Sequence, residues 1–314
     1  SLPLRFNTLT YQCDRGMGCE WRACYTALMT ELRFDLHTHS TASDGSLAPA
    51  ELVRRAVACG IEVLALTDHD QTAGLLEADT AAHEAGIEFV PGIELSVSWS
   101  HQTVHIVGLG IDPECASLQA GIERLSAFRH WRAEEIDRRL AKKGIHGALE
   151  GARAYAKGAI LSRTHFAHYL VAQGHAKDLR QVFKRFLVRN KPGYVPGEWA
   201  SLEEALTWIH EAGGLAVIAH PARYKISATR LRQLLGEFKE LGGVGLEVVS
   251  GSHSRDDILS MANLSCRYGL AASSGSDYHG PENPYLDLGR LPILPLECQP
   301  VWKHPAWDSA CGRG

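Results

Sequence analysis

The sequence predicts an α/β protein in which parallel strands form a sheet or barrel and carry a helical insert. Short apolar segments alternate with amphipathic helices up to about residue 120 and again after residue 200. This order is typical of a parallel sheet covered by helices. Several of the apolar segments end in His, Asp or Glu. Because active sites of parallel α/β folds form at the carboxyl ends of the strands, these endings indicate a site there.

The first half of the chain supplies four predicted strands, at residues 34–37, 61–66, 87–90 and 104–109. One predicted helix begins near Pro49 and stops at Gly60. A second, alanine-rich helix is predicted to end at Gly86. The polar strand endings are His37-Thr38-His39, Thr67-Asp68-His69-Asp70 and a predicted turn, Pro91-Gly92-Ile93-Glu94, while His105 lies near the start of its strand. In a strand, His37 and His39 point to the same side.

The alternation stops between about residues 120 and 200, where we expect a helical insert. Helices are predicted at residues 121–143, 162–172 and 178–188, followed by a loop at 191–196. The insert is rich in arginine, with Arg124, Arg129, Arg132, Arg138, Arg139, Arg153, Arg163, Arg180, Arg185 and Arg189.

The α/β pattern then resumes, with predicted helices at residues 202–212, 229–241 and 255–268. Strands are predicted at residues 215–219, 244–249 and 270–274, and the polar endings are His220-Pro221, Ser250-Gly251-Ser252-His253 and Ser276-Asp277-Tyr278-His279. We therefore predict a discontinuous barrel domain of residues 29–120 and 201–300, an insert domain of residues 121–200, and a C-terminal tail of residues 301–314 on the surface.

Residues 1–28 differ from the rest of the chain. They contain three of the eight cysteines and no apolar core like that of a signal peptide, and Met29 precedes the first strand as a natural start would. We expect a poorly ordered upstream extension, with a true N-terminal arm as the alternative.

Composition limits the class of protein. The formal net charge of −4 does not indicate a generally basic nucleic-acid binder, although a local basic site is compatible with it. No segment approaches the ~20 apolar residues that span a bilayer. The eight cysteines show no Cys-x-x-Cys spacing, which favours reduced thiols in the cytoplasm.

The polar strand endings together predict a metal centre. One histidine at a strand end is commonly structural, but six or more such endings on one face are difficult to assign to chance. Imidazoles and carboxylates without cysteine suit Mn, Fe or Zn in hydrolytic sites. With the turn residue Asp44, nine candidates are too many for one ion, and clustered ions are typical of phosphoryl transfer.

Five motifs resemble the PHP (polymerase and histidinol phosphatase) family of metal-dependent phosphoesterases. They are His37-Thr38-His39, Thr67-Asp68-His69, Pro91-Gly92-Ile93-Glu94, Ala219-His220-Pro221 and Ser276-Asp277-Tyr278-His279. The resemblance covers residues 33 to 300. The segments 162–166, 191–194 and 250–254 are similar to a subgroup of 3',5'-nucleoside bisphosphate phosphatases, some of which are also 5'-to-3' exoribonucleases on short RNA.

This resemblance implies a distorted (β/α)7 barrel, with the insert as a lid, and three divalent ions. Mn2+ is the favoured ion, and Zn2+, Fe2+ and Mg2+ are alternatives. One ion is assigned to His37, His39, Glu94 and Asp277, the second to Glu94, His105 and His220, and the third to Asp44, His69 and His279. Of these, Asp44, His69, Glu94 and Asp277 are the expected catalytic residues, around a metal-bridging hydroxide that attacks phosphorus. Asp44 stands where some relatives have histidine.

The insert is expected to bind the substrate's second phosphate. Arg129 and Arg132 lie one helical turn apart, and Arg163 follows Ser162 at a helix N-terminus, where an anion is favoured. The other expected contacts are Lys191, His165, Ser250 and His253. The predicted substrates are 3',5'-nucleoside bisphosphates such as pAp, which lose the 3'-phosphate, and short 5'-phosphorylated RNA. No membrane and no stable protein partner are implied.

Three alternatives are open at this point. The same metal site could hydrolyse another monoester such as histidinol phosphate, against which the basic insert argues moderately. A nuclease or proofreading module is the second, although no polymerase domain is attached. A metal-binding protein without catalysis is the third, and it predicts saturated coordination with no position for water.

Overall fold

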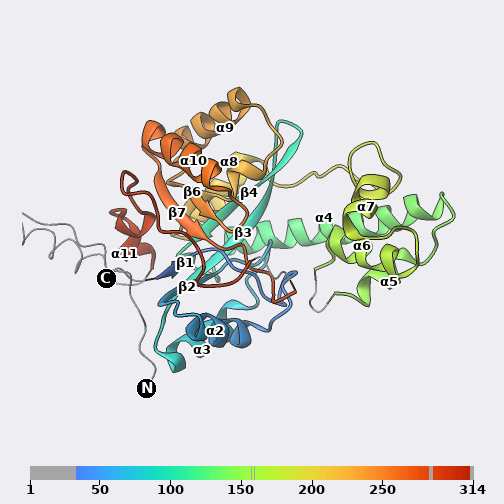
Figure 1. Cartoon of the computed structure of the whole chain (residues 1–314), viewed down its shortest axis with the longest axis horizontal. Coiled ribbons are helices and arrows are strands. Elements are labelled where there is room, and N and C mark those ends of the chain that lie inside the picture. The colour runs from blue at the N-terminus through green and yellow to red at the C-terminus, as the bar shows by residue number, and fades with distance from the viewer. Residues whose placement is uncertain (1–32, 157, 159, 283–285, 312–314) are drawn as a thin grey trace, which may run out of the picture.

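The computed structural model describes residues 33–156, 158, 160–282 and 286–311, so the predicted extension of residues 1–28 lies outside the described residues. Seven strands form one sheet in sequential order (Figure 1). They are β1 (Phe34–Asp35), β2 (Val63–Leu66), β3 (Glu88–Trp99), β4 (Gln102–Leu109), β5 (Leu215–Ile218), β6 (Gly245–Ser250) and β7 (Ala271–Gly275). The amide of Leu36, just after β1, donates to the carbonyl of Ser274 in β7 at 3.0 Å. The sheet is therefore nearly closed, and the predicted barrel class is confirmed.

One strand runs against the others. β4 pairs antiparallel with both β3 and β5, whereas the remaining neighbours are parallel. The sequence pattern predicted only parallel strands. Because β4 is reversed, His105 in its first half lies at the same end of the barrel as the carboxyl ends of its neighbours. The carbonyl of His105 accepts from the amide of Ala219, just beyond β5, at 3.1 Å.

The predicted turn at Pro91-Gly92 is wrong, because both residues lie inside the twelve-residue strand β3. Pro91 is where β3 changes partner, from β2 on one side to β4 on the other. Its missing amide is not needed there, and its carbonyl accepts from Gly110 at 2.8 Å. A Cβ on Gly92 would lie 2.9 Å from the carbonyl oxygen of Gly108, so only glycine allows this close approach.

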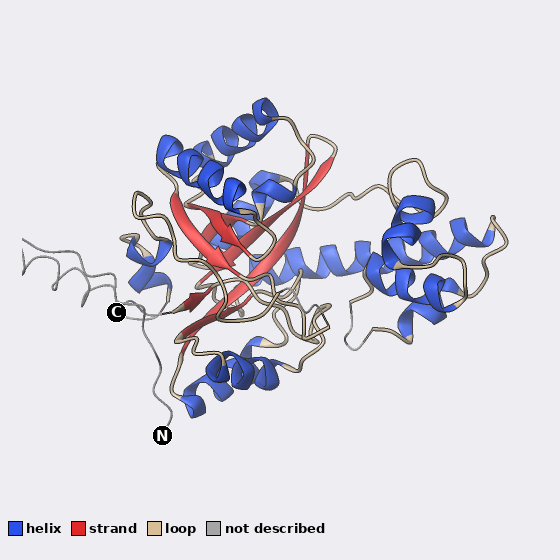
Figure 2. Ribbon diagram, viewed as in Figure 1, coloured by secondary structure: helices blue, strands red, loops and turns tan. Residues whose placement is uncertain are grey.

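The barrel helices occur where the pattern predicts them, within a few residues. They are α2 (Pro49–Ala58), α3 (Leu75–Ala85), α8 (Leu202–Glu211), α9 (Ala228–Glu240) and α10 (Arg255–Tyr268), with a short η2 (Pro221–Arg223) after β5. They cover the outside of the strands (Figure 2). Capping boxes at Ser201/Glu204 and Ser254/Asp257 fix the beginnings of α8 and α10. None of the helices in the described ranges is long and apolar enough to span a membrane.

The C-terminal segment plugs the barrel, so its predicted position on the surface is wrong. It forms η3 (Val301–Lys303) and α11 (Trp307–Ala310). Val301 and Trp307 are buried in one cluster with inward-facing strand residues such as Val63 and Val217. Trp302 also stacks on Phe34 of β1, with ring centroids 4.0 Å apart. The interior of a small barrel must be filled by side chains, and the tail supplies those at this end.

The insert has an apolar core of its own. Its first helix, α4 (Ala116–Ala141), packs Leu118 and Leu125 into the barrel core but contributes Ile136 and Leu140 to a separate cluster. That cluster is completed by α5 (Ala148–Arg153), α6 (Arg163–Ala172), α7 (Leu179–Val182) and the π-helix η1 (Phe183–Leu187). Figure 1 shows α4 leading from the barrel to this group. We propose on this basis the division into a discontinuous barrel and an insert of residues 121–200.

Two details of the insert differ from the sequence pattern. The helix α5 was not predicted, because six residues are too few to show a helical period. The single helix predicted at residues 178–188 is one α-helical turn that continues as η1. Such π-helical turns are rare and occur frequently at functional sites.

Candidate metal centre

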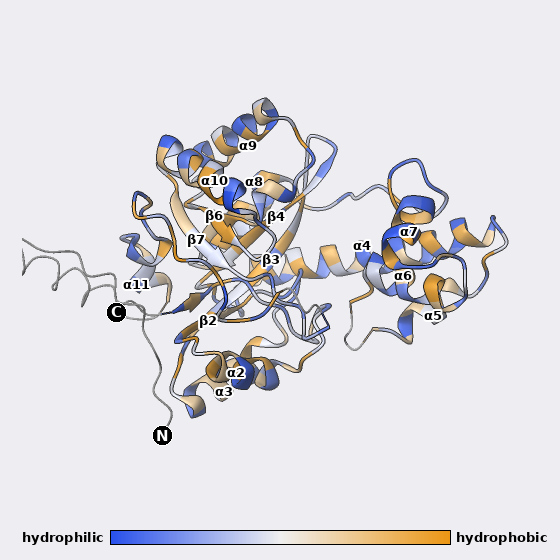
Figure 3. Ribbon diagram, viewed as in Figure 1, coloured by the Kyte–Doolittle hydropathy of each residue, from blue (hydrophilic) through white to orange (hydrophobic). Residues whose placement is uncertain are grey.

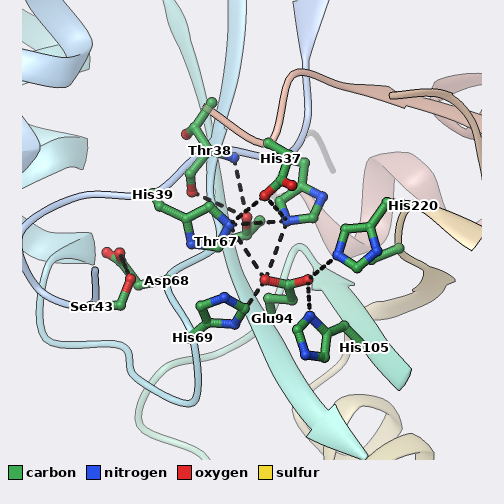
Figure 4. Close-up of polar contacts among 12 residues, drawn as sticks. His37, Thr38, His39, Ser43, Thr67, Asp68, His69, Glu94, His105 and His220 are labelled. Carbon is green, nitrogen blue, oxygen red and sulfur yellow. Dashed lines mark hydrogen bonds and ion pairs between the residues drawn. The ribbon is translucent and has the colours of Figure 1, made fainter. Parts of the chain in front are cut away.

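All nine predicted metal ligands lie together at one end of the barrel. They come from the segment after β1 (His37, His39, Asp44), from the strand ends near β2, β5 and β7 (His69, His220, Asp277, His279), and from β3 and β4 (Glu94, His105). Figure 4 shows the Glu94 carboxylate at the centre with imidazoles on both sides. The convergence that the strand endings predicted is therefore present.

The carboxylate of Glu94 is fully buried and faces five imidazoles. Its Oε1 lies 2.8 Å from Nδ1 of His105 and 3.0 Å from Nε2 of His220. Its Oε2 lies 2.8 Å from Nδ1 of His69, 3.3 Å from Nε2 of His39 and 3.4 Å from Nε2 of His37. Each oxygen thus faces its own group of nitrogens.

Three groups of side chains have ligand atoms within 4.8 Å of one another. They are His37/His39/Glu94/Asp277, His39/Asp44/His69/His279 and His69/Glu94/His105. The first group is identical to the predicted set for one ion. The second contains the predicted set with His39 added, and the third has His69 where His220 was predicted. The division of the nine ligands among three ions stays a prediction.

The donor atoms fit divalent ions. The Nε2 atoms of His37 and His39 lie only 3.1 Å apart, so both rings aim at one point. Two buried nitrogens in the cluster, His39 Nδ1 and His220 Nδ1, have no hydrogen-bond partner among the described residues. A buried polar atom without a partner costs about 1–3 kcal/mol, which a ligand can offset. Imidazole and carboxylate donors without thiolate suit Mn, Fe or Zn.

The electrostatics of the cluster keep its carboxylates ionised. Burial raises the pKa of Glu94, but the imidazoles of His69, His105 and His37 outweigh it and hold that pKa well below its usual value. The pKa of Asp277 is likewise held low. Burial lowers the pKa of His279, yet Asp44 and Asp277 raise it to about 10. Without a cation from outside, protons on imidazoles therefore balance the carboxylates.

Two ligands sit in a strained backbone conformation. His220 has φ of 28° and Asp277 has φ of 56°, the left-handed region that side-chain-bearing residues rarely adopt. Asp277 is held there by its amide, which donates to the carbonyl of His37 at 2.8 Å. Such strain clusters at functional sites, because the surroundings must impose the orientation of the side chain.

A cavity of about 680 Å³ connects the cluster to the insert. Its barrel side includes Asp44, His69, His105, His220, Asp277 and His279. Its insert side includes Arg129, Arg132, Arg163 and His165, so four of the predicted substrate residues reach it. The metal cluster and the arginines are thus two walls of one space.

The chain was compared with known proteins. A family model described as PHP domain matches residues 35–214, more than half of the chain. The chain belongs to the PHP domain family. A 3',5'-nucleoside bisphosphate phosphatase of Chromobacterium violaceum is 49% identical over 86% of this chain and 95% of its own. The 5'-3' exoribonuclease of Haemophilus influenzae is 43% identical over 86% and 98%, and 5'-3' exoribonuclease Rnm of Escherichia coli is 42% identical over 86% and 92%.

Solved structures agree with this family. An amidohydrolase of C. violaceum, with bound sulfate and no metal, has a TM-score of 0.83 at 48% identity, over 88% of this chain and 96% of that one. A protein of Bifidobacterium adolescentis, described as a metal-dependent phosphoesterase, has a TM-score of 0.72 at 25% identity, over 90% and 96%. The predicted PHP family and the predicted class of activity, hydrolysis of phosphate esters, are confirmed.

Sequence reasoning missed Glu247, which orients two residues of the PHP cluster. This buried residue of β6 holds Nδ1 of His37 at 3.0 Å from its Oε1, which leaves the other nitrogen of His37 aimed at the cluster. Its other oxygen accepts from the backbone amide of His220. The sequence did carry a signal for this role, because Glu247 is a charged residue inside the otherwise apolar predicted strand of residues 244–249.

The loop that carries His39 and Asp44 is fixed by a second unpredicted acid. Asp68 is buried and accepts from the amide of Ser40 at 2.8 Å and from the hydroxyl groups of Ser40 and Ser43. Burial nevertheless raises the pKa of Asp68. Asp68 thus acts on loop geometry rather than as a ligand.

The arginines of the PHP insert differ in their partners. Arg129 pairs with the buried carboxylate of Asp70 and donates to the hydroxyl of Ser96 at 3.0 Å. Arg132 has no carboxylate partner among the described residues, and its Nε is buried without a hydrogen bond. Burial, and then Arg163 and Arg129, lower the pKa of Arg132 to about 9. Burial also lowers the pKa of Arg163.

An unpredicted tryptophan supports two of these arginines. The guanidinium carbons of Arg129 and Arg132 lie 4.9 and 5.2 Å from the ring of Trp199, and all three residues line the cavity. Stacking on an aromatic face stabilises a cation without neutralising it. Arg223, also unpredicted, lines the cavity and donates to the carboxylate of Asp277.

Three predicted substrate contacts do not reach the cavity. Lys191 is exposed in the turn after η1. Ser250 is buried, with its hydroxyl 3.5 Å from that of Ser252. His253 has Nδ1 3.0 Å from the carbonyl of Val248, and its Nε2 accepts from the amide of Ala222 at 3.4 Å. His253 therefore ties two loops together, and local sequence could not distinguish this role from ligand binding.

Proposed function

We propose that this chain removes the 3'-phosphate from 3',5'-nucleoside bisphosphates such as pAp. The observation that carries the proposal is one cavity with a carboxylate–imidazole cluster on one wall and, on the other, two partly buried arginines, Arg132 and Arg163, without a carboxylate partner among the described residues. A substrate with two phosphates fits both walls at once. The name of the C. violaceum relative, at 49% identity, supports the same substrate class.

The cluster would hold three divalent ions, with Mn2+ as the proposed species. Bound ions of this kind lower the pKa of water and neutralise the charge that develops on a transferring phosphoryl group. Glu94 would bridge two positions, because its two oxygens face different imidazoles. Glu247 keeps the His37 ring in one orientation, and Asp277 is held toward the cavity by its backbone.

The insert wall would bind the phosphate that is not cleaved. Arg132 and Arg163 are partly buried cations with no carboxylate partner among the described residues, so a phosphate is the group that would satisfy them. Arg129 is already neutralised by Asp70 and mainly positions Trp199 and Arg132. The insert thus covers the cavity in the manner of a lid.

Short 5'-phosphorylated RNA is a second proposed substrate. It carries the same 5'-phosphate and presents a phosphodiester where the bisphosphate presents a monoester. Relatives at 42–43% identity are named 5'-3' exoribonucleases. A monoester with one phosphate, such as histidinol phosphate, leaves the arginine wall unused and is disfavoured for that reason.

The test compares two substrates in an Arg132→Gln variant loaded with Mn2+. The KM for pAp should rise by a factor on the order of 10² because a charged hydrogen bond to phosphate is lost, while the KM for p-nitrophenyl phosphate stays unchanged. Arg138→Gln is the matched control, because Arg138 lies on the same helix but is exposed and paired with Glu135. An equal rise in KM for both substrates would contradict the proposal.

A further inference from the structure

The cavity has a cation on the wall that carries the metal cluster as well as on the insert wall. Of the arginines that line it among the described residues, Arg129, Arg132 and Arg163 come from the insert and Arg223 comes from the barrel. Arg223 is the last residue of the short 3-10 helix η2, which follows β5 and the cluster residue His220. Arg223 belongs neither to the metal ligands nor to the arginines assigned to the uncleaved phosphate, so its role is not yet assigned.

A single carboxylate group separates Arg223 from the cluster. The Oδ1 atom of Asp277 lies 3.3 Å from Nε2 of His39 and 3.6 Å from Nε2 of His37. The Oδ2 atom of the same carboxylate accepts a hydrogen bond from Nη1 of Arg223. Asp277 thus presents one oxygen to the imidazoles and the other to the guanidinium group. This contact places Arg223 at the cluster end of the cavity, away from the insert arginines.

The guanidinium group of Arg223 has N–H donors that the protein does not use. Its hydrogen bond to Asp277 is the one that its side chain makes among the described residues, and the side chain is about half exposed. Figure 3 shows hydrophilic residues on α9 and α10, so an exposed charge on the barrel is ordinary by itself. Arg223 differs from those residues because it lines the cavity and contacts a member of the metal cluster.

A phosphate oxygen is the group that suits these unused donors. The guanidinium fork binds phosphate through paired hydrogen bonds, and its charge strengthens them. A phosphate that is cleaved at the cluster comes within reach of Arg223, whereas the uncleaved phosphate lies at Arg132 and Arg163. Orientation of Asp277 alone would not require an exposed side chain. Glu247, which orients His37, is buried and does not line the cavity.

We propose that Arg223 is a catalytic residue that binds a non-bridging oxygen of the phosphate that is cleaved. The inference rests on the proposed function, in that a phosphate ester is hydrolysed at the cluster. In that reaction a water oxygen forms a bond to phosphorus and the bond from phosphorus to the ester oxygen breaks. Overall, the attacking water loses a proton and the ester oxygen gains one. Arg223 takes no part in this proton transfer, and its fixed charge stabilises the negative charge that develops on the phosphoryl oxygens.

The test measures the steady-state kinetics of variants of the full-length protein loaded with Mn2+. Arg223→Gln should lower kcat for pAp and for p-nitrophenyl phosphate alike, by a factor on the order of 10², because both substrates place a phosphate at the cluster. Arg132→Gln should instead change only the KM for pAp. Arg223→Lys keeps the charge without the fork and should fall between Arg223→Gln and the wild type. The matched control is Lys225→Gln, which removes an exposed charge from the same loop, outside the cavity lining, and should retain wild-type kinetics.

Two measurements distinguish a contact with phosphate from the orientation of Asp277. The Ki of inorganic phosphate, in competition with p-nitrophenyl phosphate, should rise in Arg223→Gln by a factor on the order of 10, because a charged hydrogen bond is lost. The affinity for Mn2+, measured by isothermal titration calorimetry, should not fall. A fall in Mn2+ affinity, with kcat restored at saturating Mn2+, would overturn the inference and make Arg223 a positioning residue for Asp277.

Wild-type kcat in Arg223→Gln would also overturn the inference. A loss confined to pAp would do the same, because it would place Arg223 with the insert arginines. The proposed function fails in a different way. If the wild-type protein hydrolyses p-nitrophenyl phosphate but shows no preference for pAp, the bisphosphate substrate is refuted. The kinetics with p-nitrophenyl phosphate and the Ki of phosphate would still test Arg223 in that case.

Discussion

The barrel wall of the cavity sets each buried carboxylate among several imidazoles, whereas the insert wall sets partly buried guanidinium groups near one another. In the first wall, charges of opposite sign hold the pKa of Glu94 and Asp277 low. In the second, burial and then neighbouring like charges lower the pKa of Arg132 and Arg163. The comparison teaches that the barrel wall presents the carboxylates and imidazoles typical of a cation site, whereas the insert wall presents two cations, Arg132 and Arg163, that have no carboxylate partner among the described residues.

The largest effect is expected from the residue that both sides of the metal cluster share. Glu94→Gln should lower kcat for pAp by a factor on the order of 10³ or more, because a neutral amide cannot replace the carboxylate that faces five imidazoles of the cluster. Steady-state turnover with saturating Mn2+ is the measurement, and circular dichroism checks the fold. Arg132→Gln should retain kcat in the same assay. Retained turnover in Glu94→Gln would end the distinction between a catalytic wall and a binding wall.

The two walls should also differ in stability when the insert core is damaged. Phe166 is fully buried in the insert's own cluster, so Phe166→Ala should lower the free energy of unfolding of the insert by about 3–5 kcal/mol. Chemical denaturation followed by circular dichroism measures the loss, and calorimetry measures Mn2+ binding by the barrel. We expect Mn2+ binding to persist. If it disappears, the two cores unfold as one unit and the proposed domain division is incorrect.

A smaller effect, on the affinity for Mn2+, is expected from a change of Glu247, the carboxylate that contacts His37. Glu247→Gln should weaken Mn2+ binding by about 10–100-fold, because the amide orients His37 less strongly. Isothermal titration calorimetry gives the affinity. The matched control is Glu240→Gln, which removes an exposed carboxylate of α9. An unchanged Mn2+ affinity in Glu247→Gln would mean that the His37 orientation is set by packing alone.

The smallest effect concerns protons. In the metal-free protein the pKa of His279 is raised to about 10 by Asp44 and Asp277 against burial, and that of His37 is raised well above its usual value by Glu94 and Glu247. Both rings are therefore protonated at pH 7, and ligation requires the neutral form. Mn2+ binding should release protons, and its affinity should rise with pH from 7 toward 10. Calorimetry at pH 7 in two buffers of different ionisation enthalpy measures the release, and identical enthalpies would contradict it.

The sequence predicted the metal wall more completely than the insert wall for a physical reason. Ligands such as His37, His69 and His220 follow apolar strands, and parallel strand ends must meet at one edge of a sheet. The position of His105 at this end of the barrel was harder to predict, because an apolar run shows that a strand exists but not its direction. Glu247 was missed because a charge inside a strand shows no partner until the fold brings His37 to it.

The contacts of the insert depend on tertiary packing. Arg129 and Arg132 were correctly expected on one side of a helix, but their difference comes from Asp70, which lies 59 residues from Arg129. Lys191 and His253 belong to loops whose direction no local pattern fixes. The tail was misjudged for a related reason, because it follows a proline-rich segment, residues 281–300, that resembles a surface segment, while Trp307 fills the barrel.

The helix α4 belongs to both cores, and this fixes the distance between the two walls of the cavity. Its first turns pack in the barrel and its last turns in the insert, with Arg129 and Arg132 between them. Arg132 is therefore held at a set distance from Glu94 by one continuous rod, whereas Arg163 is attached only to the insert. The spacing between the Glu94 cluster and Arg132, which a substrate with two phosphates would have to match, is thus set by the length of one helix.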